Sequence, residues 1–260
     1  MGVALPESLR RSLSVAWVLA TSDYRYANKQ TRIGVFWPTL GLLIRIAAIS
    51  TIFAAAFRQD ATSFALLVTT GLVCWLFLSD ITTSSVTSYS RAKGLLLSMP
   101  LPAHALPLRN LLRESLFFAQ NFILVIPILF LLGELTSVRL DLFLLGLALV
   151  LPSMLGIAWT VALVSARLPD VGKLISSIMQ VLFFVTPVIW DSRRFPEGIM
   201  SVIVQINPYY HLLNVIRLPL MGDVPTLANY LVVLIGGSTS LALGYWMVKR
   251  SRNKILRWLG

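Results

Sequence analysis

The chain has 260 residues, of which 57% are hydrophobic and only 13% are charged. Soluble domains carry about 25% charged residues, so this composition excludes an ordinary soluble protein and indicates a chain whose solvent is mostly lipid. The formal net charge of +11 fits basic loops on one side of a membrane better than a nucleic-acid-binding surface.

The N-terminal segment contains an amphipathic pattern. Leu9, Leu13 and Trp17 recur every four residues and therefore share one face of a helix, while Arg10 and Arg11 lie away from that face. We interpret the pattern as a short helix lying on the cytoplasmic membrane surface. A twin-arginine or secretory signal is the alternative, but the apolar run is short and leads into charged residues instead of a cleavage site.

Membrane-spanning segments follow. About 20 apolar residues are needed to cross the hydrocarbon core. The six segments that qualify or nearly qualify are Phe36–Phe57, Ser63–Ile81, Ser115–Leu132, Leu142–Ala166, Leu174–Ile189 and Tyr230–Val248. The fifth is short for a span, which suggests an earlier start, a small tilt or a locally thin bilayer.

The basic residues between the spans are distributed unequally. Residues 1–35, 82–114, 167–173 and 249–260 together hold 16 Lys and Arg, whereas the other three connections hold 5. The positive-inside rule therefore places both termini in the cytoplasm. This placement requires an even number of spans, which agrees with the six segments. The predicted organisation is a cytoplasmic segment (1–35), a transmembrane domain (36–248) and a basic cytoplasmic tail (249–260).

The longest connection, residues 190–229, contains two apolar stretches that are too short to cross a bilayer, Ile199–Ile206 and Leu212–Leu220. Such segments are tolerated at membrane depth when they are buried against protein, so we expect two short re-entrant helices. Amphipathic helices in a surface loop are the alternative. The predicted fold is thus an all-α integral membrane protein with six transmembrane helices, an N-terminal interfacial helix and re-entrant helices between spans five and six.

Several kinds of chemistry are missing from the sequence. Gly172-Lys173 does not belong to a phosphate-binding loop, because Arg167 stands where the first glycine is required. His104 and His211 are isolated and lack metal-ligand spacing. We therefore expect no ATP site, cofactor or metal in this chain, and no catalytic residues.

Ionisable residues that could relay protons are also scarce within the spans. Asp80 lies near the end of span two, and Glu114 lies just before span three. Proton-coupled carriers usually place carboxylates in the membrane interior. If the chain transports a substrate, the energy is therefore expected to come from another subunit.

Three stretches resemble the ABC-2 family of export permeases, and most closely its polysaccharide branch, which exports O-antigen, capsule and teichoic acid. They run from Asp23-Tyr24-Arg25-Tyr26 to Trp37-Pro38, from Arg91-Ala92-Lys93-Gly94 to Leu106-Pro107-Leu108, and from Asp170-Val171-Gly172-Lys173 through Phe183–Trp190 to Ile206-Asn207-Pro208. The sequence departs from the family pattern at Thr186, where serine is usual, at Met99, where phenylalanine is usual, and at Arg45, which interrupts an apolar span.

The resemblance implies a permease subunit without its own ATP site, located in the inner membrane. It implies a homodimer paired with two copies of an ATP-binding ABC subunit that holds ATP and Mg²⁺, a lipid-linked glycan such as O-antigen as substrate, and contacts with membrane lipids but not with nucleic acid. It also implies that the N-terminal helix and the loop after span two contact the ATPase. The residues expected there are Arg10, Arg11, Arg91, Lys93, Leu95 and Leu96.

Arg45 lies nine residues past the start of span one, or ~13 Å along a helix, and therefore close to mid-membrane. An arginine at this depth is costly and normally faces a cavity or a partner. One hypothesis is that it contacts the pyrophosphate or a sugar in the export path. A structural bond to a backbone carbonyl, or snorkelling, is the other.

Aromatic residues in or beside the spans are further candidates for the export path, because the C–H faces of sugar rings suit the negative face of an aromatic ring. The candidates are Trp37, Trp75, Phe183, Phe184 and Trp190. The alternatives are an interfacial aromatic belt for Trp37 and Trp190 and ordinary packing for the others.

Two basic segments are expected on the cytoplasmic side. The loop 91–109 combines basic residues with prolines, which make the loop stiff. A stiff loop is suited to transmit movement of a partner subunit, and its basic residues are suited to bind lipid head groups. The tail after residue 248 lacks proline, and we expect it to be frayed or lipid-bound.

The favoured function is export of a lipid-linked polysaccharide driven by a separate ATPase. The same architecture would also suit an exporter of a drug or a small lipid. A membrane-embedded glycosyl or phosphate transferase is a more distant alternative, because acidic residues and histidines do not cluster near a membrane face. A scaffold without a transport role is disfavoured by Arg45 and by the short apolar stretches.

Overall fold

A computed structural model describes residues 7–27, 29, 31–57, 61–99, 101–192, 197–251 and 254–259, without the side chains of residues 7–9, 56–57 and 61–63. Residues 58–60, which connect the first two predicted spans, and Pro100 lie outside the described residues, as does the side chain of Leu9. All regular elements in the described ranges are helices. They are α1 (Glu7–Tyr26), η1 (Gly34–Phe36), α2 (Trp37–Phe57), α3 (Ala61–Val86), α4 (Ser88–Arg91), α5 (Lys93–Ser98), α6 (Ala105–Leu131), α7 (Leu140–Arg167), α8 (Pro169–Val185), α9 (Ile199–Ile206), α10 (Pro208–Leu220), α11 (Leu227–Ser251) and α12 (Ile255–Trp258).

Five of these helices are long and apolar enough to cross a membrane: α2, α3, α6, α7 and α11. The prediction of an all-helical, multi-pass membrane protein is therefore confirmed. The predicted fifth span corresponds to α8, which has 17 residues and ends before Thr186-Pro187. Helix α6 begins ten residues before the predicted span. Residues 105–114 are helical although they include four polar side chains, whereas hydropathy marks only the apolar part of the helix.

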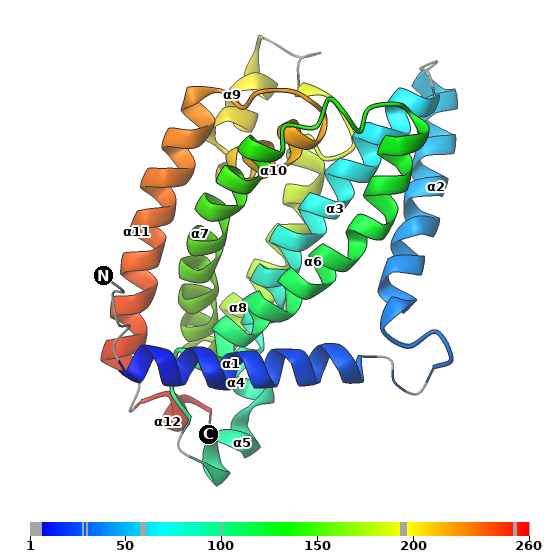
Figure 1. The fold of residues 1–260 in the computed structure, drawn as a ribbon. Coiled ribbons are helices and arrows are strands. Elements are labelled where there is room, and N and C mark those ends of the chain that lie inside the picture. Colours follow the sequence, from blue (N-terminus) through cyan, green and yellow to red (C-terminus); the bar gives the residue numbers. More distant parts are fainter. Residues whose placement is uncertain are drawn as a thin grey trace, which may run out of the picture.

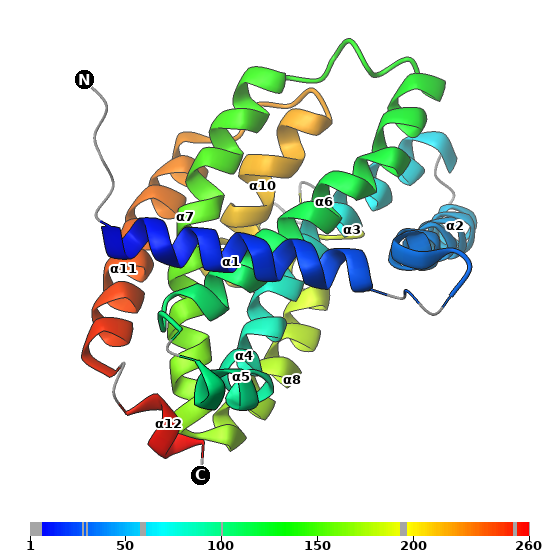
Figure 2. The same ribbon diagram turned by 60° about the horizontal axis from the view of Figure 1, so that its bottom comes forward.

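Helix α1 lies across one end of the bundle, at a steep angle to the long helices (Figure 1, Figure 2). It packs against α6 through a stripe of small residues, Ser12, Ala16 and Ala20, all of which are buried. Leu13 and Trp17 lie on the exposed side of the helix. An apolar face thus remains uncovered at this end, as the amphipathic pattern predicted.

The most extensive contact between two helices is that of α7 with α11, and small residues make it close. A Cβ atom on Gly156, Gly237 or Gly244 would overlap atoms of the facing helix. Small residues at such positions let two membrane helices approach closely. Ser240 adds a hydrogen bond from its hydroxyl to the Ser153 backbone oxygen (3.1 Å).

The two short apolar stretches of the longest connection form helices α9 and α10, as predicted. Helix α9 is mostly exposed, whereas α10 is buried between α3, α7 and α11 (Figure 1). The Asn207 side chain caps α10 by accepting a hydrogen bond from the Tyr209 backbone N–H (3.0 Å). The backbone of α10 also reaches α7 directly, because Gly146 lies against the Val215 carbonyl.

The basic tail is folded against the bundle, which corrects the expectation that it is frayed or lipid-bound. Helix α12 contacts α7 and α5, and Ile255 is buried there. The Lys93 ammonium donates a hydrogen bond to the Leu259 backbone oxygen (2.7 Å), and Arg167 lies over the Trp258 ring. The sequence pattern missed this contact because the tail has a single turn of apolar residues.

Candidate functional site

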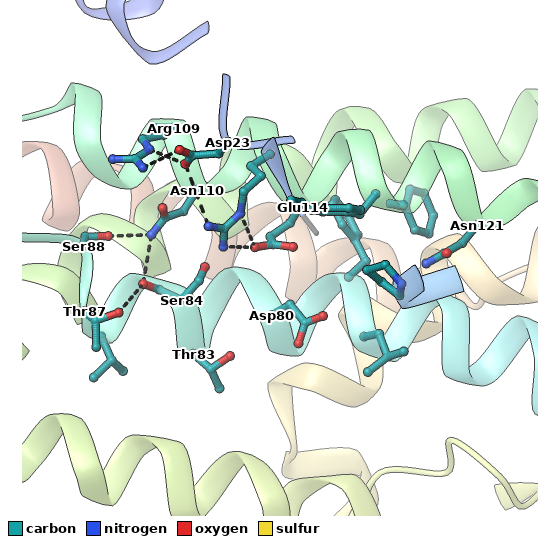
Figure 3. A pocket seen from close by; sticks show the side chains of 18 of the residues that line it. Asp23, Asp80, Thr83, Ser84, Thr87, Ser88, Arg109, Asn110, Glu114 and Asn121 are labelled. Atoms are coloured by element: carbon teal, nitrogen blue, oxygen red, sulfur yellow. Dashed lines mark hydrogen bonds and ion pairs between the residues drawn. The ribbon is translucent and has the colours of Figure 1, made fainter. Parts of the chain in front are cut away.

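A cavity of about 860 Å³ lies between α2, α3 and α6 near the α1 end of the bundle. The end of α1 contributes Asp23 and Tyr26 to its lining, and α8 contributes Ser176. Figure 3 shows Asn110 of α6 bonded to Ser88 and to the Ser84 backbone oxygen of α3 at one end of this space. A charged cavity of this size between apolar helices is the most conspicuous candidate site in the described part of the chain.

Ion pairs fix the wall of this cavity where α1 crosses α6. Arg109 donates two hydrogen bonds to the Asp23 carboxylate, from Nε to Oδ2 (2.6 Å) and from NH2 to Oδ1 (2.7 Å). Arg113 lies 4.0 Å from Asp23 and also pairs with Glu114 (Figure 3). Two-pronged arginine–carboxylate pairs fix geometry as well as contributing energy, so the position of α1 on α6 is well defined.

A second polar chain connects α1 to α2 through α6. The Tyr24 hydroxyl donates to Gln120 Oε1 (2.5 Å), and Gln120 Nε2 donates to Thr39 Oγ1 (2.6 Å). Thr39 in turn donates to Asn121 Oδ1 (2.9 Å). A displacement of α1 is therefore passed to two of the helices that form the cavity wall.

Arg45 lines the same cavity from α2, and Asp80 lines it from α3. The Arg45 Nε donates a hydrogen bond to the Gly41 backbone oxygen (3.3 Å). The side chain is therefore tied to a backbone carbonyl, as one hypothesis expected, and it also faces a cavity.

The predicted aromatic path does not lie in this cavity. Trp75 is buried and packs against Phe183, with ring centroids 6.0 Å apart. Phe183 contacts Phe184, and the Trp190 indole N–H donates to the Phe184 backbone oxygen (3.2 Å). The structure thus brings four of the five aromatic candidates together beside α8, while Trp37 is exposed at the start of α2.

The predicted ATPase contacts lie at the α1 end. Arg91 is exposed at the mouth of the cavity, and Arg10 and Arg11 are exposed on α1. Lys93 is hydrogen-bonded to the C-terminal tail. Leu96 packs into a small hydrophobic core between α4, α6 and α7. Leu95 is half-buried, whereas its neighbours Leu97 and Met99, which the sequence reasoning did not select, are exposed.

The sequence analysis did not identify the ion pairs that line the cavity. Asp23 and Asn110 were not selected as site residues, and Arg109 was assigned to a loop although it lies in α6. A signal was present, because Arg109, Arg113 and Gln120 lie at near-helical spacing and mark one polar face. Among the described residues, no three His, Cys, Asp or Glu side chains come together as a metal site.

Comparison with known proteins gives a consistent result, although no family model matches the chain. An O-antigen export system permease protein RfbA of Myxococcus xanthus is 23% identical over 89% of this chain and 91% of its own length. Two proteins of the same name from Klebsiella pneumoniae are 21% and 23% identical, over 80% and 74% of this chain and of their own lengths. The chain is a homologue of the O-antigen export permeases. The resemblance to ABC-2 polysaccharide export permeases is thereby confirmed.

The structure gives physical roles to residues of the stretches that carry the resemblance to the O-antigen export permeases. Asp23 and Tyr24 fasten α1 to α6. Asn207 starts α10, and its side-chain Nδ2 donates to the Thr186 hydroxyl (2.7 Å). Because only the hydroxyl of Thr186 is used in that bond, threonine replaces the serine usual at this position without loss of the contact.

Proposed function

We propose that this chain is the membrane-spanning permease subunit of an ABC exporter that moves a lipid-linked polysaccharide, such as O-antigen, across the inner membrane. Its similarity to O-antigen export permeases covers most of both sequences, which carries the proposal. The all-helical fold with five long apolar helices agrees with a subunit of this kind.

The cavity beside α1 is proposed to receive the anionic head of the lipid-linked glycan. Arg45 on α2 and Arg91 on α4 both line it and are both exposed, so two guanidinium groups mark a route from the α1 end into the bundle. A guanidinium binds phosphate oxygens through several N–H groups, which suits a diphosphate. The paired Arg109 and Arg113 are already held by carboxylates and serve to shape the wall.

The proposed topology has six spans and both termini in the cytoplasm. Helix α8 would be the fifth span in chain order and would bring the total to six: its 17 residues fall at the short end of the range that crosses a bilayer. An exposed apolar stripe of Leu174, Ile178, Val181 and Phe184 along α8 supports this assignment. Residues 1–35, 36–248 and 249–260 would then be the cytoplasmic segment, the membrane domain and the cytoplasmic tail. Helices α9 and α10 would lie on the external side.

The partner would be an ATP-binding ABC subunit, present in two copies beside a homodimer of this chain and holding ATP and Mg²⁺. Its docking surface is proposed at the α1 end, on α1, α4 and α5. The contact between α12 and α5 supports this proposal, because it holds the protruding helix α5 in place (Figure 1).

Deleting the gene for this chain in its own host tests the function. We expect surface polysaccharide to be lost and lipid-linked glycan to accumulate inside the cell, and re-expression of the chain restores export. Re-expression of an Arg45→Gln variant, which keeps a polar N–H donor but removes the charge, should restore export only weakly. Unchanged surface polysaccharide after the deletion would contradict the proposed function.

The topology is tested by labelling single cysteines in intact cells. The one native cysteine, Cys74, is buried and can be replaced by alanine to give a background without thiols. A membrane-impermeant maleimide should modify a cysteine at Met200 on α9 but not one at Ser251 at the end of α11. Modification of the cysteine at Ser251 would refute the orientation.

A further inference from the structure

A second, smaller pocket lies at the opposite end of the bundle from α1. Its volume is about 270 Å³, and it is enclosed by the segment after α8, by α10 and by the start of α11. The cavity beside α1 shares none of its lining residues. Figure 1 places α9 and α10 at the end away from α1, so the two spaces open at different ends of the molecule.

The walls of this pocket, termed here the α10 pocket, are held rigidly. Arg217 donates a hydrogen bond to the Pro187 backbone oxygen, which fixes the segment after α8 to α10. The His211 ring lies 2.8 Å from Asn229 Oδ1 and 2.8 Å from the Gln205 backbone oxygen, which ties α10 to both α11 and α9. A pocket framed in this way keeps its shape when empty, which lowers the entropic cost of binding.

Two buried side-chain amides line the α10 pocket with hydrogen-bonding capacity to spare. Asn214 is only 5% exposed, and within the described part of the chain its side chain makes no hydrogen bond to protein. Asn229 is 3% exposed and uses one end of its amide on His211, which leaves the other end without a partner among the described residues. Buried polar groups are normally satisfied, so these amides indicate a polar occupant.

Two aromatic side chains complete the wall. Trp190 is contributed by the segment after α8 and Tyr210 by the first turn of α10. Aromatic rings beside side-chain amides suit a sugar, because the ring face accepts C–H groups while each amide pairs with hydroxyls that both donate and accept. The volume lies near the lower end of the range for ligand pockets, roughly 300–1,000 Å³, so it has room for one sugar ring rather than a chain.

The charges of the α10 pocket disfavour a phosphate group. Of the lining side chains that the structure describes, Asp191 and Asp223 are acidic and Arg217 is basic. Arg217 is engaged with the Pro187 carbonyl, so the basic group in the described lining already has a partner. The occupant favoured by these groups is therefore an uncharged ring with several hydroxyls, not the diphosphate of a lipid carrier.

We propose that the α10 pocket binds one neutral sugar residue of the glycan at the end of the protein opposite α1. This inference rests on the proposed export function, which supplies a glycan as the ligand. Diphosphate and sugar would then be recognised at separate ends: the diphosphate in the charged cavity and the sugar among the amides and aromatic rings. Binding of a sugar at the α10 end would favour outward movement of a glycan whose diphosphate is still bound at the α1 end.

The test measures binding of a lipid-free glycan to the purified chain in lipid nanodiscs. The probe is polysaccharide released by mild acid from the strain that encodes this chain, titrated by saturation-transfer NMR, with inorganic phosphate as competitor. Asn214→Ala should raise Kd about 3- to 10-fold, the usual effect of removing one hydrogen bond. Tyr210→Ala, a half-buried position that disturbs packing less, should raise Kd by a similar factor.

A matched control removes an aromatic ring elsewhere. Trp246 is exposed on α11 outside the pocket, so Trp246→Ala should leave the glycan Kd unchanged, whereas Trp190→Ala should raise it. Phosphate should not displace the glycan. The proposal is overturned if the wild-type chain does not bind the glycan, if Asn214→Ala and Tyr210→Ala both bind it with unchanged Kd, or if phosphate competes.

The gene deletion separates this inference from the proposed function. If deletion abolishes export while the pocket variants bind glycan normally, the function stands and the sugar site fails. If deletion leaves export intact while the pocket variants lose glycan binding, the sugar site stands and the proposed function fails.

Discussion

At the α1 end of the bundle, contacts between helices are made by charged groups around a cavity of about 860 Å³. At the α9 end, they are made by hydrogen bonds from Asn207 and from Arg217 and by backbone lying directly against glycine. Helices beside a cavity have space to move into, whereas backbone packed directly on backbone does not. The comparison suggests that the α1 end is built to shift under an external push while the α9 end stays fixed.

Close backbone packing at the α9 end gives the largest expected effect. A Cβ atom on Gly71 would overlap the Val188 backbone oxygen, whose segment is held by Arg217, so Gly71→Ala should lower the free energy of unfolding by about 1–3 kcal/mol. The matched control is Gly41→Ala on α2, where nothing lies within 4 Å and alanine should be neutral or stabilise by up to about 1 kcal/mol. Thermal unfolding in detergent measures both, and equal effects would remove the proposed contrast in packing.

The ion pair between α1 and α6 is the next test. A double-mutant cycle with Asp23→Asn and Arg109→Gln should give a coupling free energy of about 1–2 kcal/mol, because the pair is two-pronged and three-quarters buried. Hydrogen exchange in α1 should increase in both single variants. The exposed Lys173–Asp170 pair serves as control and should show a coupling below about 0.5 kcal/mol. Similar coupling for the two pairs would contradict the special role given to the α1 wall.

Charge at the mouth of the cavity is expected to have a smaller effect, and only on the assembled exporter. Reversal of Arg91 and Lys93 together should weaken association with the ATPase subunit by about 1 kcal/mol while sparing membrane insertion. Because Lys93 also bonds the tail, Arg91→Glu alone separates partner contact from loss of the α12 bond. Lys249→Glu is a control at an exposed basic position of the same end. Wild-type assembly and export in the double reversal would show that this loop is not the coupling surface.

The smallest expected effect is a pH dependence at the α1 end. His104 is half-buried against Trp159 and Tyr245, and burial lowers its pKa, with a smaller opposing effect from a hydrogen bond to the Tyr245 backbone. A histidine with a depressed pKa takes up protons more readily when the chain is unfolded. Its contribution to stability is therefore present above the unfolded pKa of about 6.5 and is lost as pH falls through the folded pKa. The stability lost between pH 7.5 and pH 5.5 should be smaller in His104→Gln than in the wild type; an equal loss would mean that His104 does not contribute.

Much of the fold follows from local patterns that are visible in the sequence. The apolar runs located each long helix, and the short run Ile199–Ile206 matches α9 from its first to its last residue. The helix ends were less accurate. Helix α3 continues to Val86 and α6 starts at Ala105, because a helix extends into polar sequence wherever neighbouring helices supply hydrogen bonds. Asn110 illustrates this, since its Nδ2 donates to the Ser84 backbone oxygen (3.0 Å) and to Ser88 Oγ (2.6 Å).

The candidate site was only partly predictable. Arg45 was selected because of its position within an apolar span, and the structure places it in the lining of the cavity. The aromatic candidates were chosen by type, and the structure places them outside that cavity, since a type does not specify which helix lies opposite.

The sequence by itself determined the class of the protein, the positions of its helices and the uneven distribution of basic residues, because each depends on composition within one segment. Tertiary structure decided which polar groups meet. Asp23 and Arg109 are 86 positions apart, and Asn229 is 18 positions from His211, so neither pair produces a local pattern. The charged cavity and the α10 pocket arise from such pairs, because helices bring together side chains whose spacing along the chain carries no information about their distance in space.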